Sequence, residues 1–234
     1  MLVVEGDLIN SGDISFQETD DLLVKGNIID SGTMSDPDPD AGTSPADRLY
    51  TLGLFQGTGT DAEGKPVYDL HIKPTRQVAI TMLVRLLGKE KEALSSPVDH
   101  PFTDVDAWAS PYVGYAYANE LTKGISDMEF GSHDLLTANQ YITFILRALG
   151  YSDVLGDFRW DKPTELSEKI GLTGDAYKNN SAPFFRGDVV VISESALRTK
   201  MKNSDVNLLQ HLLDNKAVKV EDIIKAGLGH LVDF

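Results

Sequence analysis

From residue 45 onward, apolar side chains recur at intervals of three and four residues, which is the period of an α-helix with one buried face. Residues 72–88 (IKPTRQVAITMLVRLLG) and 137–150 (TANQYITFILRALG) show this period most clearly. Their apolar stripes consist of Val78, Ala79, Met82 and Leu86, and of Tyr141, Phe144, Ile145 and Ala148. We predict that both stretches are helices whose stripes face a core.

These two helical stretches are copies of one unit. Residues 82–88 (MLVRLLG) return 62 positions later as residues 144–150 (FILRALG), and Thr75 corresponds to Thr137 at the same offset. Because both the apolar pattern and the polar positions repeat, we interpret the similarity as a duplication.

A shorter apolar stretch that opens with proline precedes each of the two copies, at Pro45 and at Pro111. A third such stretch begins at Pro163. Proline suits the first turn of a helix, where its missing N–H is not needed. In the third unit, residues 184–197 (FFRGDVVVISESAL) supply the second helix. We therefore predict a mainly α protein of three helix-loop-helix units, residues 45–98, 99–150 and 151–200, followed by a helical extension, residues 201–234, that docks on the third unit.

The N-terminal segment, residues 1–34, has a different sequence pattern. GDLINSG at residues 6–12 returns as GNIIDSG at residues 26–32, so short β runs and turn glycines repeat with a period of 20 residues. This period is typical of solenoid coils, and residues 1–34 are interpreted as a β segment, the possible end of a β-solenoid. The alternative is a plain β-hairpin or two packed strands. Residues 35–44, rich in Asp, Pro, Gly and Ser, are predicted to be a linker.

Composition narrows the class of partner. The 234 residues carry a net charge of −15, with acidic side chains spread along the chain, which argues against nucleic acid as the main partner. Cysteine is absent, and no apolar run approaches the length needed to span a membrane, so we expect no membrane insertion. The N-terminus lacks a signal-peptide pattern, and if the parent protein is secreted its signal lies outside this chain.

No motif for catalysis or metal binding is present. The five histidines lack the spacing of a metal site, and no hydrolase, zinc-protease or phosphate-loop motif occurs. The acidic pairs Asp20/Asp21 and Asp104/Asp106 supply the two carboxylates that a glycosidase needs, but solvated loop acids are far commoner. We predict no catalytic residue, metal or cofactor.

Residues 100–150 closely resemble the S-layer homology repeat. Its pattern is F-x-D-V, a tryptophan, an apolar helix, a G-I turn, an I-T-R-A-E-like helix start and an R-x-L-G close. The matching residues are Phe102, Asp104, Val105, Trp108, Gly124, Ile125, Thr137, Arg147 and Gly150. The resemblance covers about residues 45–200 as three repeats and implies a three-pronged, pseudo-threefold helical module. About such an axis we expect the first helices of the three units to form a central bundle, with the second helices outside.

The arginine at the start of the family's second helix corresponds to Arg76 and, more loosely, to Arg186. A cation there is unfavourable for the helix dipole, which suggests a role in binding. The guanidinium and the unpaired N–H groups of the helix N-terminus would together form an anion site. The alternative for Arg76 is a salt bridge to a local acid such as Asp69. The second repeat has Ala138 at this position, which puts the groove on this repeat in doubt, so we expect fewer than three working grooves.

Six further residues complete the set of candidate ligand-binding positions. Thr137 with Gln140 forms a T-x-x-Q capping box at the start of its helix, and Thr75 is its counterpart in the first repeat. The tryptophans are expected mainly in the repeat cores, with stacking on sugar rings as the alternative. Arg85 and Arg147 are expected to brace neighbouring repeats. The six candidates are Thr75, Thr137, Trp108, Trp160, Lys123 and Gly124.

Two functions remain open. The resemblance implies a non-catalytic module that holds a secreted protein on a bacterial cell surface or cell wall by binding a secondary cell-wall polysaccharide, often one capped with a pyruvylated sugar. The alternative is the anchoring part of a secreted carbohydrate-active enzyme or adhesin whose β-solenoid-like N-terminal region carries the activity. The sequence leaves the oligomeric state open.

Overall fold

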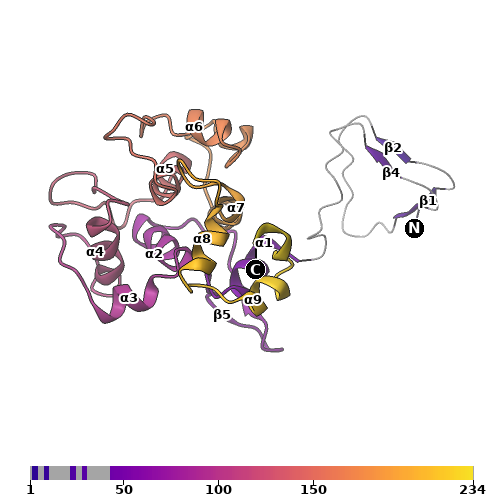
Figure 1. The fold of residues 1–234 in the computed structure, drawn as a ribbon, viewed down its shortest axis with the longest axis horizontal. Coiled ribbons are helices and arrows are strands. Elements are labelled where there is room, and N and C mark those ends of the chain that lie inside the picture. The colour runs from indigo at the N-terminus through magenta and orange to yellow at the C-terminus, as the bar shows by residue number, and fades with distance from the viewer. Residues whose placement is uncertain (1, 5–7, 11–21, 25–27, 31–42, 234) are drawn as a thin grey trace. The chain divides into compact units, whose positions relative to one another are not determined.

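The structure is a computed structural model that describes residues 2–4, 8–10, 22–24, 28–30 and 43–233 of the chain. The chain divides into two compact units, Met1–Ala41 and Gly42–Phe234 (Figure 1). Most of the predicted linker, residues 35–42, lies outside the described residues. Among the helices that are described, none is long and apolar enough to cross a membrane.

In the first unit, the described residues form four short strands that pair in parallel. Strand β1 lies beside β3, with Leu2 opposite Leu22, and β2 lies beside β4, with Leu8 opposite Ile28. Both registers reproduce the 20-residue repeat, whereas a hairpin would pair its strands antiparallel. A β-solenoid remains a prediction for this segment, since two coils do not make a continuous core. The strands span Leu2–Val4, Leu8–Asn10, Leu22–Val24 and Ile28–Asp30.

The second unit is mainly helical, as the periodicity predicts. Its described helices α1 to α9 span Pro45–Thr51, Arg76–Leu86, Glu90–Ser95, Ser110–Ala118, Ala138–Ala148, Thr164–Lys169, Arg186–Arg198, Leu208–Asp214 and Val220–Lys225. A small antiparallel pair, β5 and β6, and two 3₁₀ turns, η1 and η2, occupy Gly59–Thr60, Pro66–Val67, Asp175–Tyr177 and Gly229–Leu231. Helix α3 was not predicted from the sequence.

Helices α2, α5 and α7 are the second helices of the three predicted helix-loop-helix segments, and they contact one another at the centre (Figure 1). They supply many of the largest fully buried side chains, among them Ile80, Leu83, Tyr141 and Ile142. The expectation that the first helices form the central bundle is therefore wrong. The physical reason is that α2 and α5 bury apolar residues outside their predicted stripes, Ile80, Leu83 and Val84 in α2 and Ile142 and Leu146 in α5, and a helix of that kind is stable only when it is surrounded.

Each first helix packs on the second helix of another unit. Helix α4 lies against α2, α6 against α5, and α1 against α7, so that the contacts close into a ring. At the closing contact, Arg48 Nε of α1 lies 3.3 Å from Glu194 Oε1 of α7, and both side chains are buried.

The N-termini of the second helices are covered in the same cyclic order. The N–H groups of Arg76 and Gln77 donate to carbonyl oxygens of the loop before α5, at 2.9 and 3.2 Å, and those of Arg186 and Gly187 donate to carbonyls of the loop before α2, both at 2.8 Å. The N–H of Asn139 in α5 donates to Asn180 Oδ1, in the loop before α7, at 2.9 Å. Each of the three predicted helix-loop-helix segments thus supplies hydrogen-bond acceptors for the N-terminal N–H groups of a second helix in another segment.

The C-terminal extension forms helices, as predicted, and α8 packs on α7 of the third unit. It also reaches the other units, because α9 contacts α1 and Ala217 lies against Gly88 at the end of α2. Gly88 has φ +65°, and a Cβ there would lie 2.5 Å from that of Ala217. The extension therefore closes over an end of the central bundle.

Helix α4 approaches the chain before it very closely at Gly114, where a Cβ would lie 1.9 Å from the carbonyl oxygen of Val98. Replacing glycine by alanine inside a helix ordinarily stabilises it by about 0.5–1 kcal/mol. Here Gly114→Ala is expected to destabilise the protein by about 1–3 kcal/mol, because a backbone oxygen must move. Chemical denaturation measures this change, and Ala118→Ser, at an exposed position on the same helix, is the control. A stabilised Gly114→Ala variant would contradict the close packing.

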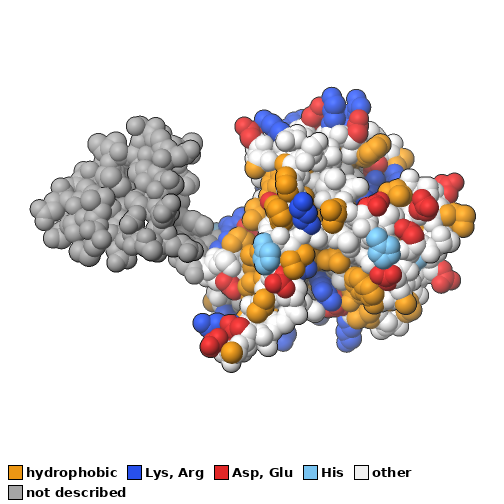
Figure 2. All heavy atoms as spheres, turned by 180° about the vertical axis from the view of Figure 1, so that it is seen from behind, with side chains coloured by type: hydrophobic (Ala, Val, Ile, Leu, Met, Phe, Trp, Pro, Cys, Tyr) orange, Lys and Arg blue, Asp and Glu red, His pale blue; other side chains and the backbone are white. Residues whose placement is uncertain are grey.

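Acidic and basic side chains of the described residues are interspersed over the face shown in Figure 2. That face therefore offers no broad basic surface, and an anion would have to be bound by local geometry.

Candidate functional site

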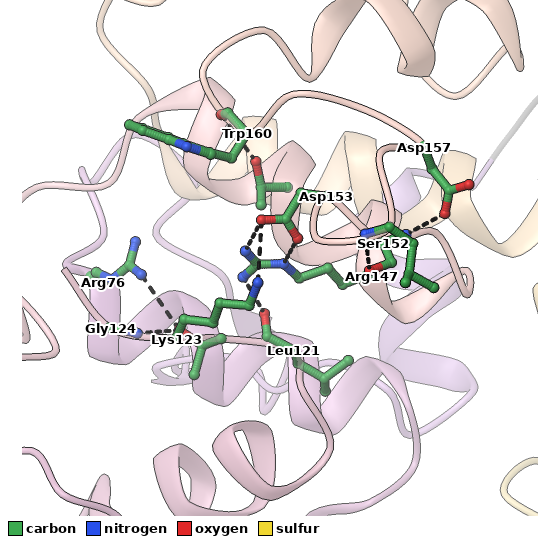
Figure 3. Close-up of polar contacts among 12 residues, drawn as sticks. Arg76, Leu121, Lys123, Gly124, Arg147, Ser152, Asp153, Asp157 and Trp160 are labelled. Atoms are coloured by element: carbon green, nitrogen blue, oxygen red, sulfur yellow. Dashed lines mark hydrogen bonds and ion pairs between the residues drawn. The ribbon is translucent and has the colours of Figure 1, made fainter. Parts of the chain in front are cut away.

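A groove of about 680 Å³ lies over helix α5 and brings together five of the eight candidate residues. We call it the α5 groove. Arg76 reaches it from α2, Lys123 and Gly124 from the loop after α4, Thr137 from the cap of α5, and Trp160 from the loop after α5. It is completed by Ile125, Asn139, Gln140, Thr143, Phe144, Arg147, Asp153, Asp161 and Asn180. Figure 3 shows Arg76 to the left of the Arg147–Asp153 pair, Lys123 reaching toward the pair from below, and Trp160 above it.

Arg76 is a buried cation, with only 5% of its surface exposed. Its guanidinium carbon lies 4.9 Å from the ring centroids of both Phe130 and Phe144. Nη2 donates a 3.4 Å hydrogen bond to Thr122 Oγ1, and Nε has no hydrogen-bond partner. Within residues 43–233, no carboxylate forms an ion pair with it. Burial, followed by the like charge of Arg147, lowers the pKa of the Arg76 guanidinium to about 10, so it stays protonated at neutral pH.

The predicted alternative, a salt bridge between Arg76 and Asp69, is wrong. Asp69 accepts a hydrogen bond from the Thr58 hydroxyl at 2.5 Å, and its charge acts on Arg186. The contribution that the helix N–H groups were expected to make to the anion site is contradicted at four of them, since those of Arg76, Gln77, Arg186 and Gly187 already donate to carbonyl oxygens of other loops. The guanidinium of Arg76 still has an Nε without a hydrogen-bond partner.

Arg147 closes one wall of the groove through a bidentate ion pair. Its Nε and Nη2 donate to Asp153 at 3.0 and 2.9 Å, and Nη1 donates to the carbonyl oxygen of Leu121 at 3.2 Å. Lys123 Nζ lies 3.5 Å from the same Asp153 carboxylate. Burial alone would raise the pKa of this carboxyl, but the bonds and charge of Arg147 hold it below its usual range. Arg147 therefore braces α5 against two loops, the one that carries Leu121 and the one that follows α5.

The threonines and Gly124 have structural tasks that fix the groove. Thr137 and Gln140 form the predicted capping box of α5, with reciprocal hydrogen bonds of 3.4 and 3.1 Å. Thr75 is the N-cap residue of α2, but its hydroxyl is buried without a partner and lies outside the α5 groove. Gly124 has φ +76°, and a Cβ there would lie 2.4 Å from Phe102 Cε1, so the turn requires glycine.

Both tryptophans are exposed, Trp160 by 68% and Trp108 by 51%. The expectation that they belong mainly to the repeat cores is wrong. An exposed indole beside a groove that also carries an arginine is instead suited to stacking on an apolar sugar face.

Trp108 lies in a second, smaller groove of about 210 Å³ over helix α2. We call it the α2 groove. Arg186, with 8% of its surface exposed, lines it, and its guanidinium carbon lies 5.4 Å from the Phe55 ring centroid. Arg186 Nε donates to the carbonyl oxygen of Tyr68 at 3.1 Å. The other lining residues are Gln56, Gly57, Thr58, Val78, Thr81, Met82 and Arg85.

The two grooves share one plan. In each, the arginine comes from the start of a different second helix, the tryptophan from the loop before a first helix, and a paired arginine from the end of the lining helix. Arg85 Nε pairs with Glu90 at 2.7 Å, as Arg147 pairs with Asp153. The α5 groove takes its arginine from the start of α2, and the α2 groove takes its arginine from the start of α7. Ala138, at the start of α5, lines neither groove, so the missing arginine there does not affect them. Trp108 lies in the α2 groove, whereas residues of the TKGIS loop, residues 122–126, lie in the α5 groove.

Asp104, which sequence reasoning treated as a solvated loop acid, organises the loop beside Arg76. Its carboxylate accepts the backbone N–H groups of Phe130, Gly131 and Ser132, at 2.7 to 2.9 Å. This loop then supplies the Phe130 ring beside the guanidinium and the carbonyls that cap α2. Asp104 therefore supports the site without facing it.

The sequence model described as the S-layer homology domain matches residues 101–137, from Asp104 through the TKGIS loop to the cap of α5. The chain carries an S-layer homology domain. Three relatives are similar to it along 66% of its length: a middle cell wall protein of Brevibacillus brevis (strain 47) with 31% identity, a surface layer protein of Brevibacillus choshinensis with 30%, and a cell surface protein of Thermoanaerobacter kivui with 28%.

The chain spans only a small part of these relatives: 14% of the Brevibacillus brevis protein, 13% of the Brevibacillus choshinensis protein and 20% of the Thermoanaerobacter kivui protein. Within the part of the chain that the structure describes, no group of three or more His, Cys, Asp or Glu side chains is placed to hold a metal ion.

Proposed function

We propose that the chain is a non-catalytic module that anchors its parent protein to a bacterial cell surface by binding an anionic cell-wall polysaccharide. The observation that carries the proposal is Arg76, a buried guanidinium without a carboxylate partner in residues 43–233, which lines a groove beside an exposed tryptophan. A buried charge without a counter-ion is costly, and an anionic ligand would supply the missing partner. The S-layer homology match and the names of the relatives support the same direction.

The chemistry of the groove fits an acidic sugar. A guanidinium presents a planar set of donors that matches a carboxylate, and the indole of Trp160 offers a flat apolar surface to a sugar ring. A pyruvylated sugar combines these features, because its ketal carries one carboxylate on a saccharide ring. We propose such a unit as the ligand, with Lys123, Gly124 and Thr137 shaping the groove around it and Arg186 and Trp108 serving the α2 groove.

We further propose that residues 45–98, 99–150 and 151–200 are three repeats about a pseudo-threefold axis. The cyclic packing of α4 on α2, α6 on α5 and α1 on α7 supports this arrangement, and so does the cyclic capping of the second helices. In this proposal residues 201–234 are a helical extension and residues 1–34 are the end of a β-solenoid joined through the linker.

Sedimentation with protein-free cell walls tests the anchoring function. The chain should pellet with intact walls and stay in solution with walls stripped of their non-peptidoglycan polymer. Equal binding to both wall preparations would reject a specific polysaccharide ligand. Release of reducing sugar in the same assay would favour the alternative of a carbohydrate-active enzyme.

Trp160→Ala is expected to weaken binding to the isolated wall polysaccharide by about fivefold to tenfold, since it removes a stacking surface worth about 1 kcal/mol. The melting temperature should hardly change, because the side chain is exposed. Calorimetric titration measures the affinity, and the control is Leu155→Ala, which removes an exposed apolar side chain from the same loop between α5 and α6. Equal affinities of the two variants would argue against stacking.

A further inference from the structure

Trp160 borders a second hollow besides the α5 groove. This hollow has a volume of about 440 Å³, and its lining includes Asp153, Phe158, Arg159, Trp160, Asp161 and Glu165. We call it the outer hollow. Because Asp153, Trp160 and Asp161 also line the α5 groove, the two hollows adjoin at these residues. A ligand longer than one sugar unit therefore has room to continue from the α5 groove into the outer hollow.

The loop that carries Trp160 is fixed on both sides of the indole. The carbonyl oxygen of Trp160 accepts a 3.5 Å hydrogen bond from Thr143 Oγ1 of α5, and the carbonyl oxygen of Asp161 accepts a 3.1 Å hydrogen bond from Asn139 Nδ2. Phe158, two residues before the tryptophan, is buried. The indole itself is exposed, so it is a preformed apolar surface that borders both hollows.

The carboxylates that line the outer hollow all have cationic partners. The ion pairs are Asp153 with Arg147 at 2.9 Å, Asp161 with Arg159 at 2.6 Å, and Glu165 with Lys162 at 3.7 Å. Arg76 in the α5 groove differs, because it has no carboxylate partner within residues 43–233. Paired carboxylates still accept hydrogen bonds from hydroxyl groups, and a paired guanidinium still donates them. The outer hollow therefore suits an uncharged group that is rich in hydroxyls.

We propose that the outer hollow is a second saccharide subsite, which binds an uncharged sugar unit joined to the acidic sugar at Arg76. The inference rests on the proposed function and extends its ligand from one sugar to two. Stacking on Trp160 and hydrogen bonds to Glu165 hold the second sugar, and the volume of about 440 Å³ lies in the range of small-ligand sites. Glu165 is a specificity-determining residue, since it lines the outer hollow and not the α5 groove.

NMR titration of the full chain tests the inference. The probes are neutral methyl glucoside, methyl glucuronide, and two disaccharides in which glucuronic acid is joined to the 3- or the 4-hydroxyl of glucose. The chain has two tryptophans, so two indole N–H signals report separately on the α2 groove, through Trp108, and on the α5 groove with the outer hollow, through Trp160. We expect at least one disaccharide to bind about threefold to tenfold more tightly than methyl glucuronide, as read from the Trp160 signal. If neither disaccharide binds more tightly there, the inference is overturned.

Two variants locate the second sugar. Glu165→Ala should reduce the advantage of the disaccharide to less than about twofold and leave the affinity for methyl glucuronide unchanged. The control, Glu168→Ala, removes an acid of the same helix that pairs with Lys178 and lines neither hollow, and it should retain the advantage. A Glu165→Ala variant that keeps the full advantage would place the second sugar elsewhere and sink the inference. Failure of the natural chain to bind methyl glucuronide more tightly than methyl glucoside would instead reject the proposed anion site, and the inference with it.

Discussion

Arg76→Met is expected to weaken binding of the wall polysaccharide by about tenfold to a hundredfold, since a charge-assisted hydrogen bond to a buried group contributes about 1.5–3 kcal/mol. Methionine retains an apolar stem between the rings of Phe130 and Phe144, so the packing is largely kept. The melting temperature should stay level or rise, because the change removes a buried cation without an ion pair in residues 43–233. Calorimetric titration and melting curves measure both effects.

The matched control for this change is Arg159→Met, which removes an exposed arginine paired with Asp161 near the same groove. It should cost less than about 1 kcal/mol of binding free energy. If Arg76→Met binds the polysaccharide like the natural chain, Arg76 is a structural residue and the groove is not an anion site. Loss of binding together with unfolding would lead to the same conclusion.

Asp104→Asn is expected to destabilise the protein by about 2–4 kcal/mol, because an amide can accept only part of the three backbone N–H bonds that the carboxylate accepts. Binding should weaken as well, since the loop that these bonds hold carries Phe130 and the carbonyls capping α2. Denaturant unfolding measures the loss, and Asp127→Asn, at an exposed position before this loop, is the control. Similar unfolding free energies for the two variants would contradict the role of Asp104.

The same substitution has a defined pH dependence. Burial alone would raise the pKa of the Asp104 carboxyl, but the three backbone N–H bonds outweigh it and lower the pKa. A carboxyl whose pKa is lowered by folding stabilises the folded state above its unfolded pKa of about 3.9, and this stabilisation is lost as the pH falls through the folded pKa. The difference between the natural chain and Asp104→Asn should therefore be full at neutral pH and narrow below about pH 4.

Local features of the fold could be predicted from the sequence. The stripes of α2 and α5 and the capping box at Thr137 depend on residues within one or two turns of one another, and the structure confirms them. The order in which the helices pack could not be predicted in this way, because a stripe shows that a face is buried without showing which helix covers it. A signal was present nonetheless: α2 is apolar beyond its stripe, at Ile80, Leu83 and Val84, which favours a central position.

In the candidate site, too, local features could be predicted from the sequence, whereas contacts made only by the tertiary fold could not. Arg76 stands out in the sequence because a cation opposes the helix dipole, and the structure places it in a groove. Asp153 was missed, since it follows the end of α5 in a loop without periodicity and meets Lys123 only through the tertiary fold. The repeat that aligns Arg85 with Arg147 could have drawn attention to the acids just beyond each helix, Glu90 and Asp153.

The contact between α1 and α7 has a mechanical consequence for an anchoring module. Helix α1 is the first helix after Gly42, while both grooves are lined by later helices, α2 and α5. When the polysaccharide holds the grooves and tension arrives along the chain before Gly42, the force enters through α1. Its attachments to α7, the packed helix face and the Arg48–Glu194 ion pair, are loaded before either groove is.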